Sequence, residues 1–336
     1  MTDIGHIGVV GGGAWGTALA CLARRAGRKV TLWSRDSAIS RAIADERANP
    51  VYLPGIPLEA GIVAVTNLEE LGACDALLLV CPAQVVREVG RRLPGHSPVV
   101  ICAKGIEASS GLLMPEVLEQ VQPGRTLALL SGPSFAEEAV RGLPTAISIA
   151  TLDPNIGRDL AASLAAGMFR PYWTHDVPGV ALGGAVKNVL AIAAGIVEGR
   201  GLGHNATAAL ITRGFAEMAR LGQAMGAELE TMTGLSGLGD LVLTCHGPLS
   251  RNRSLGAALG QGMTLAGFMK GRRQVVEGEA TAPAVLARAA RHGIEMPICT
   301  AVDAILHKGA DLDATIRGLL ARPLRREANE NSRARI

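Results

Sequence analysis

The chain has 336 residues, a formal net charge of +3 and only 3% aromatic residues. A single hydrophobic core stops growing at about 250–300 residues, so this length favours two domains. The balanced charge argues against nucleic-acid binding, and the six cysteines, which form no C-x-x-C pair, argue against a disulfide framework or a metal site.

The first segment of the chain predicts a dinucleotide-binding unit. Residues 4–10 predict a buried strand, and residues 17–25 have the apolar pattern of a helix. Between them lies Gly11-Gly12-Gly13-Ala14-Trp15-Gly16, which has the G-x-G-x-x-G spacing in its strand–turn–helix context. In that motif the first glycine allows a tight turn, the second lets the backbone approach a pyrophosphate, and the third lets the helix pack on the strand. A turn that is merely rich in glycine is the alternative interpretation.

A second strand is predicted at residues 29–33, followed by Ser34-Arg35-Asp36. An NAD-specific site usually places an acidic residue at this strand end, on the adenine ribose. Here Arg35 comes first and suits a 2′-phosphate or stacking on adenine, whereas Asp36 comes slightly late. We therefore expect NADPH to be favoured, with NADH as a further possible cofactor.

Three further strands are predicted at residues 76–80, 99–102 and 127–130, and each ends in a polar or turn-forming segment. Ligands of open parallel sheets bind beyond the carboxyl ends of the strands, so these segments are expected to form a cofactor site. Lys104 follows the second of these strands and is a candidate for this site; a solvated loop lysine is the alternative. Together the elements predict an α/β fold, with an N-terminal Rossmann-type doubly wound sheet.

Beyond Trp173 the strand patterns fade and helical patterns follow, which predicts an all-helical C-terminal domain. These patterns cover residues 180–196, 205–225, 234–243, 255–259, 282–292 and 300–306, with Asn205 and Thr281 as expected N-caps. We expect residues 1–175 to bind a dinucleotide and residues 176–323 to bind a substrate. The charged tail, 324–336, is expected to be disordered.

Lys187 is the only charged residue between positions 177 and 197. Lysine is rarely fully buried without a partner, and burial favours its neutral form. We therefore expect Lys187 to have a lowered pKa and to transfer protons near the interdomain cleft. Three alternatives are a membrane span, a lysine that extends from a half-buried helix into solvent, and a structural partner for a buried carboxylate.

Two further segments carry groups suited to a small anionic substrate. Asp240 follows a glycine pair, and Thr244 lies one helical turn further on the same face. Ser250-Arg251-Asn252-Arg253 supplies a guanidinium fork, amides and a hydroxyl, which suit phosphate or carboxylate. The alternatives are a helix-capping aspartate and a solvated basic turn.

Taken together, these motifs resemble the bacterial NAD(P)-dependent glycerol-3-phosphate dehydrogenase family over about residues 7–306. The matching segments are 11–19, 52–54, 103–107, 131–136, 142–146, 183–188, 209–214, 237–245, 250–253 and 275–278. Ala14 stands where the family commonly has a serine, so a hydroxyl contact to phosphate is expected to be absent.

The resemblance implies NAD(P)H-dependent reduction of dihydroxyacetone phosphate to sn-glycerol 3-phosphate for phospholipid synthesis, by a cytoplasmic homodimer. It implies that Lys187 exchanges the proton, and we expect Lys104, Asp240, Asn188 and Thr244 to support it. The implied substrate residues are Lys104, Gly132, Ser134, Lys187, Asp240, Ser250, Arg251 and Asn252. The expected dinucleotide residues are Gly11, Gly13, Ala14, Trp15, Gly16, Arg35, Lys104, Ala136, Arg251, Val275 and Glu277.

Two other functions remain as alternatives at this point. One is a hydroxyacid or ketopantoate reductase of similar architecture, in which a carboxylate replaces the phosphate. The other is a non-catalytic protein that senses NAD(P). Because residue 1 leads directly into a strand-like segment, we expect no signal peptide and a soluble protein that is not inserted in a membrane.

Overall fold

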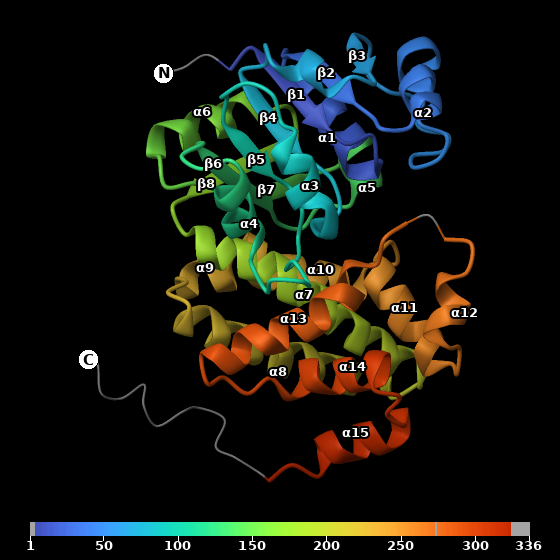
Figure 1. Ribbon diagram of the computed structural model, residues 1–336. Coiled ribbons are helices and arrows are strands. Elements are labelled where there is room, and N and C mark those ends of the chain that lie inside the picture. Colours follow the sequence, from blue (N-terminus) through green and yellow to red (C-terminus); the bar gives the residue numbers. More distant parts are fainter. Residues whose placement is uncertain (1–3, 273, 324–336) are drawn as a thin grey trace.

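The computed structural model describes residues 4–272 and 274–323, and the predicted tail, 324–336, lies outside the described residues. An eight-stranded sheet with flanking helices occupies the N-terminal half, and the described residues of the C-terminal half form helices and no strand (Figure 1). The change occurs between strand β8 (Phe169–Thr174) and helix α7 (Val177–Gly199). The predicted fold class, a Rossmann-type sheet followed by an all-helical domain, is confirmed.

The strands lie in the order β3-β2-β1-β4-β5-β6-β7-β8. Their bounds are β1 His6–Val10, β2 Lys29–Trp33, β3 Ile62–Val65, β4 Ala76–Leu79, β5 Val99–Ile101, β6 Leu127–Ser131 and β7 Thr145–Ala150. All neighbouring strands are parallel except β6 and β7, which are antiparallel. Strands β3, β7 and β8 were not predicted from the sequence. Strand β8 contains Pro171, which a sheet tolerates at its edge.

The strand order reverses between β1 and β4. From β1 the chain moves outward to β2 and β3, then returns across β1 to add β4. In an open sheet, this reversal creates a crevice beyond the carboxyl ends of the two strands, where ligands bind. The turns after β1, β4, β5 and β6 therefore meet at one edge of the sheet.

Alternate residues of the central strands face two different hydrophobic cores. Val9 and Leu78 lie in the core beneath helix α1 (Ala14–Arg25). Val10 and Leu77 lie in the core on the other face, which continues into the helical half through α7. The sheet and the helical half thus share one continuous core.

The remaining helical elements divide between the two halves. In the first half they are α2 Ser37–Arg41, η1 Ala42–Glu46, η2 Leu68–Leu71, η3 Ala83–Val85, α3 Val86–Arg91, α4 Met114–Val121, α5 Ala136–Val140 and α6 Pro154–Leu164. In the second half they are α8 Gly203–Ala224, α9 Leu229–Thr233, η4 Leu235–Gly239, α10 Asp240–His246, α11 Arg251–Gly260, α12 Leu265–Met269, α13 Glu277–Arg291, α14 Pro297–His307 and α15 Leu312–Leu320.

Two predicted N-caps are wrong. Asn205 lies inside α8, which begins two residues earlier, after Leu202. Thr281 lies inside α13, where its buried hydroxyl donates to the carbonyl oxygen of Glu277 at 2.6 Å. A threonine can bond to a carbonyl one turn back as well as cap a helix, and here the first role prevails.

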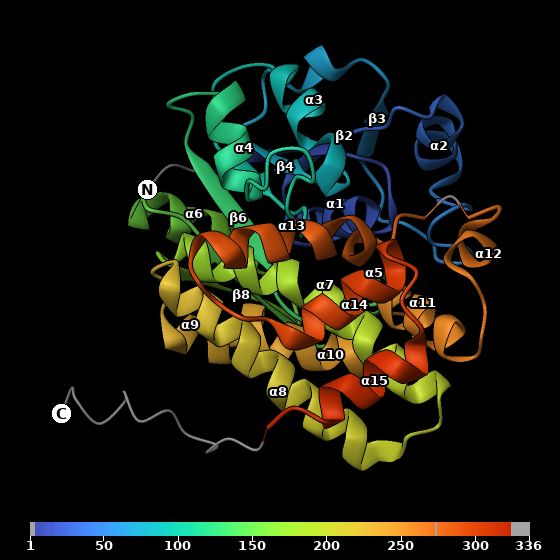
Figure 2. The same ribbon diagram turned by 60° about the horizontal axis from the view of Figure 1, so that its bottom comes forward.

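Helix α7 is the central helix of the second half, and α8, α10, α11, α13 and α14 pack around it (Figure 2). It is long and apolar enough to cross a membrane, but its most apolar window is entirely buried inside the protein. Its glycines allow this packing. A Cβ at Gly195 would overlap the carbonyl oxygen of Arg253, and a Cβ at Gly256 would overlap that of Ile192. The backbones of α7 and α11 therefore approach very closely.

Glu217 joins two of the helices that surround α7. From α8, its carboxylate accepts hydrogen bonds from the backbone N–H groups of Ile298 (2.8 Å) and Cys299 (3.4 Å), at the start of α14. The side chain is buried, and burial raises the pKa of Glu217 from 4.5 to about 7. In the folded protein the protonated form is therefore favoured below about pH 7.

This pKa predicts a pH-dependent stability. Because the folded state binds more protons than the unfolded state between pH 4.5 and about 7, the contribution of Glu217 to stability falls as the pH rises through that window. Glu217→Gln removes the titrating group. Urea unfolding at about pH 5 and about pH 8 should show the wild type losing stability relative to this variant. Parallel changes in both proteins would contradict the assignment.

Candidate active site

The carboxylate of Asp240 binds two lysines from opposite halves of the protein. Its Oδ1 accepts a hydrogen bond from Nζ of Lys187 at 2.5 Å, and its Oδ2 accepts one from Nζ of Lys104 at 2.7 Å. Lys187 lies in α7, and Lys104 lies in the turn after β5. The Asp240 side chain is 1% exposed, so both ion pairs form away from bulk water.

Lys187 and Lys104 each have one further acceptor. Nζ of Lys187 donates to Oγ1 of Thr244 at 3.1 Å, and the hydroxyl of Thr244 in turn donates to the backbone oxygen of Asp240 at 2.6 Å. Nζ of Lys104 donates to the carbonyl oxygen of Gly132 at 3.0 Å. The Lys187 side chain is 8% exposed and that of Lys104 is 16% exposed, so the cluster opens to solvent on the side of Lys104.

Burial sets the protonation of this cluster. Burial lowers the pKa of Lys187 from 10.5 to about 7, with the charge of Asp240 opposing the change and that of Lys104 adding to it. Burial alone would raise the pKa of Asp240, but the positive charges of Lys104 and Lys187 hold it below its usual value. The site therefore has a fixed anion next to a lysine that gains and loses its proton near neutral pH.

The segment that delivers Asp240 is not the continuous helix that the sequence predicted. Residues 235–239 form a single π-helical turn, η4, and the α-helix α10 begins only at Asp240. A Cβ at Gly237 would overlap the carbonyl oxygen of Met232, and one at Gly183 of α7 would lie 2.6 Å from that of Ser236. The wide turn brings η4 against α7 and so places Asp240 beside Lys187.

Side-chain amides extend from Lys104 to the start of α13. Nδ2 of Asn188 donates to the carbonyl oxygens of Lys104 (3.0 Å) and Gly184 (3.3 Å). Its Oδ1 accepts from Nδ2 of Asn252 at 2.9 Å, and Oδ1 of Asn252 accepts from the N–H of Gly278 at 2.9 Å. Both amides are buried, so Asn188 and Asn252 position the backbone around the cluster.

The glycine-rich loop after β1 has the geometry expected of a dinucleotide loop. Gly11 has φ +131°, which favours glycine, and a Cβ at Gly16 would overlap the carbonyl oxygen of Gly11. A Cβ at Gly13, by contrast, would meet no atom within 4 Å. Ala14 and Trp15 open α1, and Nε1 of Trp15 is buried without a hydrogen-bond partner in the described parts of the chain. The loop can therefore admit a ligand at Gly13, which fits a diphosphate.

Arg35 and Asp36 differ in how they are engaged. Asp36 accepts a hydrogen bond from the N–H of Ala38 at 2.9 Å and caps α2. Arg35 is exposed at the end of β2, beside the crevice. The aspartate is thus already occupied by a helix cap, whereas the arginine faces solvent.

The turn after β6 lies beside Lys104. Gly132 has φ +130°, and its carbonyl oxygen also accepts from the hydroxyl of Ser134 at 2.9 Å. Ala136 begins α5. This turn therefore brings Gly132 and Ser134 to the same edge of the sheet as the lysine cluster.

The start of α11 supplies the second polar group of the cleft. Ser250 caps this helix, its Oγ accepting from the N–H of Arg253 at 3.2 Å. Arg251 is exposed and is close enough to Glu277 for the two charges to interact. Arg253 points elsewhere and pairs with Glu198. Only one of the two arginines in the predicted anion-binding motif is therefore available to a ligand.

Glu277 connects the helical half to the sheet half. Its Oε1 accepts from the N–H of Ala83, after β4, at 3.1 Å, while Oε2 is buried without a partner among the described residues. Burial raises the pKa of Glu277. Val275, two residues earlier, is 39% exposed. Both residues lie where the start of α13 meets the turn after β4.

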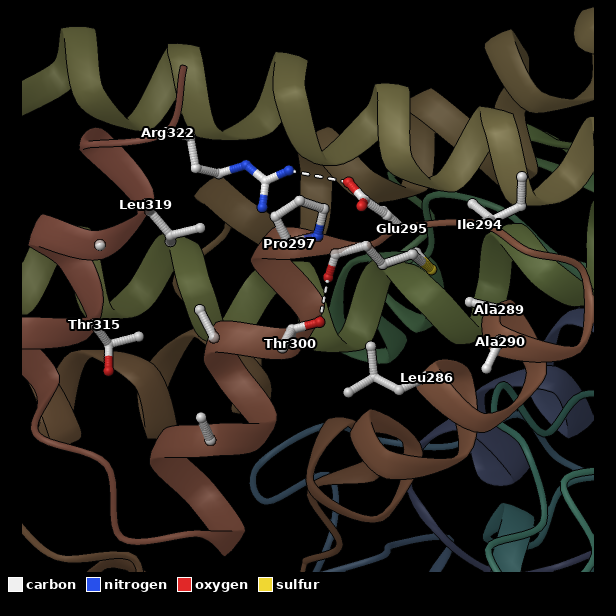
Figure 3. Close-up of a pocket in the computed structure, with 14 residues that line it drawn as sticks. Leu286, Ala289, Ala290, Ile294, Glu295, Pro297, Thr300, Thr315, Leu319 and Arg322 are labelled. Atoms are coloured by element: carbon white, nitrogen blue, oxygen red, sulfur yellow. Dashed lines mark hydrogen bonds and ion pairs between the residues drawn. The ribbon is translucent and has the colours of Figure 1, made fainter. Parts of the chain in front are cut away.

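Two cavities lie outside the lysine cluster. The larger, of about 530 Å³, lies between α13, α14 and α15 and contains none of the predicted site residues; the Arg322–Glu295 ion pair borders it (Figure 3). The smaller, of about 300 Å³, is lined by Tyr52 and Arg272 from opposite halves.

Asn49 was not predicted from the sequence as a site residue; its buried amide donates to the carbonyl oxygen of Gly12, in the glycine-rich loop, and to Oγ1 of Thr17. The available signal was the Asn49-Pro50 pair, which only Val51 separates from the matching segment 52–54.

Comparisons with known proteins identify the family of the chain. The N-terminal model of the NAD-dependent glycerol-3-phosphate dehydrogenases matches residues 6–156, and the C-terminal model matches residues 176–317. The chain is 53% identical over 327 residues to the glycerol-3-phosphate dehydrogenase (NAD(P)+) of Maricaulis maris, covering 96% of this chain and 98% of the relative. It is 54% identical to the enzyme of the same name from Rhodospirillum rubrum, covering 98% and 96% of the two chains.

The fold agrees as well. A crystal structure of the glycerol-3-phosphate dehydrogenase of Coxiella burnetii superposes with a TM-score of 0.90 at 40% identity, covering 94% of this chain and 99% of that one. Because both halves match in sequence and in fold, the chain belongs to the NAD(P)-dependent glycerol-3-phosphate dehydrogenase family.

Proposed function

We propose that this protein catalyses the reversible, NAD(P)H-dependent reduction of dihydroxyacetone phosphate to sn-glycerol 3-phosphate. The observation that carries the proposal is the Lys187–Asp240–Lys104 cluster at the carboxyl edge of the Rossmann sheet. Oxidation of NADPH and NADH on addition of dihydroxyacetone phosphate is the direct test. Turnover of ketopantoate instead would favour the reductase alternative, and cofactor binding without turnover would favour a sensor.

The glycine-rich loop is the proposed site of the dinucleotide diphosphate. Gly11, Gly13 and Gly16 provide the turn, the open approach and the close helix packing, with Ala14 and Trp15 at the helix start. We expect further contacts from Lys104, Ala136, Arg251, Val275 and Glu277. NADPH should be favoured over NADH because Arg35 is exposed at the strand end while Asp36 caps α2. Residues 1–175 would then hold the dinucleotide, and residues 176–323 would complete the substrate site.

Lys187 is the proposed proton donor in reduction and the proton acceptor in oxidation. The bound dinucleotide supplies the hydride that C2 of the ketone accepts. The ketone oxygen then gains negative charge and needs a proton, which Lys187 provides from Nζ. Lys104 adds a second positive charge at that oxygen, an effect worth roughly 3–4 kcal/mol for one well-placed donor.

Asp240 keeps both lysines in place for this step. A buried ammonium without a counter-ion would lose its proton, whereas two ammonium groups around one carboxylate leave a net positive charge for the developing oxyanion. Thr244 accepts a second hydrogen bond from the Lys187 ammonium group and so helps to hold it in place. Asn188 holds the Lys104 backbone. Gly132 and Ser134 would shape the edge of the substrate site.

The substrate phosphate would bind at the start of α11. The N–H groups in the first turn of a helix favour an anion, and Arg251 adds a planar guanidinium beside them. Ser250 and Asn252 lie at the same helix end. Phosphate binding at a distance from C2 supplies energy that fixes the ketone against Lys187.

Three further parts of the proposal rest on the family resemblance. We expect a homodimer, a cytoplasmic protein not inserted in a membrane, and a role in supplying glycerol phosphate for phospholipid synthesis. Light scattering of the purified protein tests the first part.

Replacing Lys187 tests the proton transfer. Lys187→Met should lower kcat at least about 100-fold, because general acid–base catalysis contributes that much or more, while the Kd for NADPH changes little. Lys308, an exposed lysine paired with Asp303, provides the matched control, Lys308→Met. Near-normal turnover by Lys187→Met would contradict the assignment.

The pKa of Lys187 predicts opposite pH profiles for the two directions. Reduction requires the protonated amine, so its kcat/KM should fall about tenfold per pH unit above about 7. Oxidation requires the neutral amine, so its kcat/KM should rise as the pH increases towards about 7 and level off above that value. Initial rates in both directions from about pH 5.5 to about pH 9 provide the measurement. A reduction rate that stays constant across this range would exclude Lys187 as the proton donor.

Replacing Arg251 tests the phosphate site. Arg251→Ala should raise the KM for dihydroxyacetone phosphate about 10- to 100-fold, since a charge-assisted hydrogen bond is lost, and should affect dihydroxyacetone far less. Arg253→Ala is the control, because Arg253 lies in the same turn of α11 as Arg251 but pairs with Glu198 of α7. Equal effects of Arg251→Ala on both ketones would remove the phosphate assignment.

A further inference from the structure

Asn49 is a buried amide that the proposed mechanism does not use. It lies between η1 and β3 and is 0% exposed. Buried Leu53 and Ile56 anchor the segment that carries it, and the N–H of Leu53 donates to the backbone oxygen of Asn49 at 2.9 Å. The position of Asn49 relative to the sheet is therefore fixed by packing.

The Asn49 side chain donates its N–H groups to two residues on either side of Gly13, one in the glycine-rich loop and one in α1. Nδ2 donates to the carbonyl oxygen of Gly12 at 2.9 Å and to Oγ1 of Thr17 at 2.8 Å. Its Oδ1 accepts from the N–H of Tyr52 at 3.2 Å. With both N–H groups occupied, the side chain has no donor left for a ligand.

The bond to Gly12 determines the direction of a neighbouring N–H group. In a planar trans peptide, the carbonyl of one residue and the N–H of the next point in opposite directions. Because Asn49 binds the Gly12 carbonyl, the Gly13 N–H points away from Asn49. Without this bond, the peptide could rotate and present its carbonyl oxygen, which repels an anion, in place of the N–H.

The bond to Thr17 acts on the helix side of the loop. Thr17 is fully buried, and its N–H donates to the carbonyl oxygen of Gly13 at 2.9 Å, which closes the first turn of α1. Asn49 therefore connects the peptide before Gly13 to the residue that closes the turn after it.

We propose that Asn49 is a positioning residue that holds the glycine-rich loop in the conformation required by the dinucleotide diphosphate. This inference rests on the proposed function, since it assigns a diphosphate to the loop. It gives Asn49 a role in cofactor affinity, although both N–H groups of its side chain are already occupied within the protein.

Fluorescence titration of the full-length protein with NADPH, without substrate, tests the inference. Asn49→Ala should raise the Kd for NADPH about tenfold or more. Asn49→Asp keeps the size of the side chain but loses both N–H groups and adds a negative charge, so the increase should be at least as large. In both variants, kcat at saturating NADPH should stay within about threefold of the wild-type value.

A second pair of ligands separates a diphosphate effect from a general loss of structure. The affinity for ADP should fall with that for NADPH, whereas the affinity for adenosine, which has no phosphate, should not change. Thr151→Val is the matched control. Thr151 is buried and donates to Leu127 O at the opposite edge of the sheet, so its variant should lower Tm and leave the Kd for NADPH unchanged.

Folded Asn49 variants that bind NADPH with the wild-type Kd would overturn the inference. If Asn49→Ala does not fold, Thr17→Val replaces it in the test, because this change removes one of the two acceptors of the Asn49 amide. A wild-type Kd for NADPH in Thr17→Val would also overturn the inference. The same measurements on the wild-type protein distinguish a failure of this inference from a failure of the proposed function. A wild type that neither binds NADPH or NADH nor oxidises them with dihydroxyacetone phosphate contradicts the function itself.

Discussion

The site depends on one carboxylate placed between two ammonium groups. Taking Asp240, Lys187 and Lys104 out of water costs several kcal/mol per ion, and their mutual attraction offsets this cost only because the contacts are short and each lysine has a further acceptor. Lys187 and Asp240 come from the helical half and Lys104 from the sheet half. The ion pairs of the proposed proton-transfer site therefore also connect the two halves of the protein.

The rest of the helical half serves to place these charges. Close packing of α7 and α11 at glycine positions brings the start of α11 to the cleft, and the π-turn η4 brings Asp240 to α7. The amides of Asn188 and Asn252 then fix the backbone of Lys104 relative to α11 and α13. Proton transfer, charge stabilisation and anion binding are thus assigned to separate side chains in one rigid network.

Local patterns in the sequence predicted much of the fold and the residues that the structure brings together in the lysine cluster. The glycine spacing, the strands that flank it and the single charge in an apolar helix are all local signals, so β1, β2 and Lys187 were found. The edge strand β8 was missed because Pro171 and its exposed aromatic side chains break the buried-strand pattern. The partner of Lys187 was only a candidate, since the pairing joins positions 53 residues apart. Asn49 was missed for the same reason: its bonds to the loop span 32 and 37 residues.

The core on one face of the sheet continues through α7 into the helical half. Two bodies that share a core cannot separate without exposing its apolar surface to water, which costs about 25 cal/mol for each square ångström. The sheet half and the helical half should therefore melt as one unit. Rigid-body separation of the two halves is therefore disfavoured as a way to open the site. A ligand would instead enter through movement of the turns after the strands and of the side chains at the mouth of the cleft.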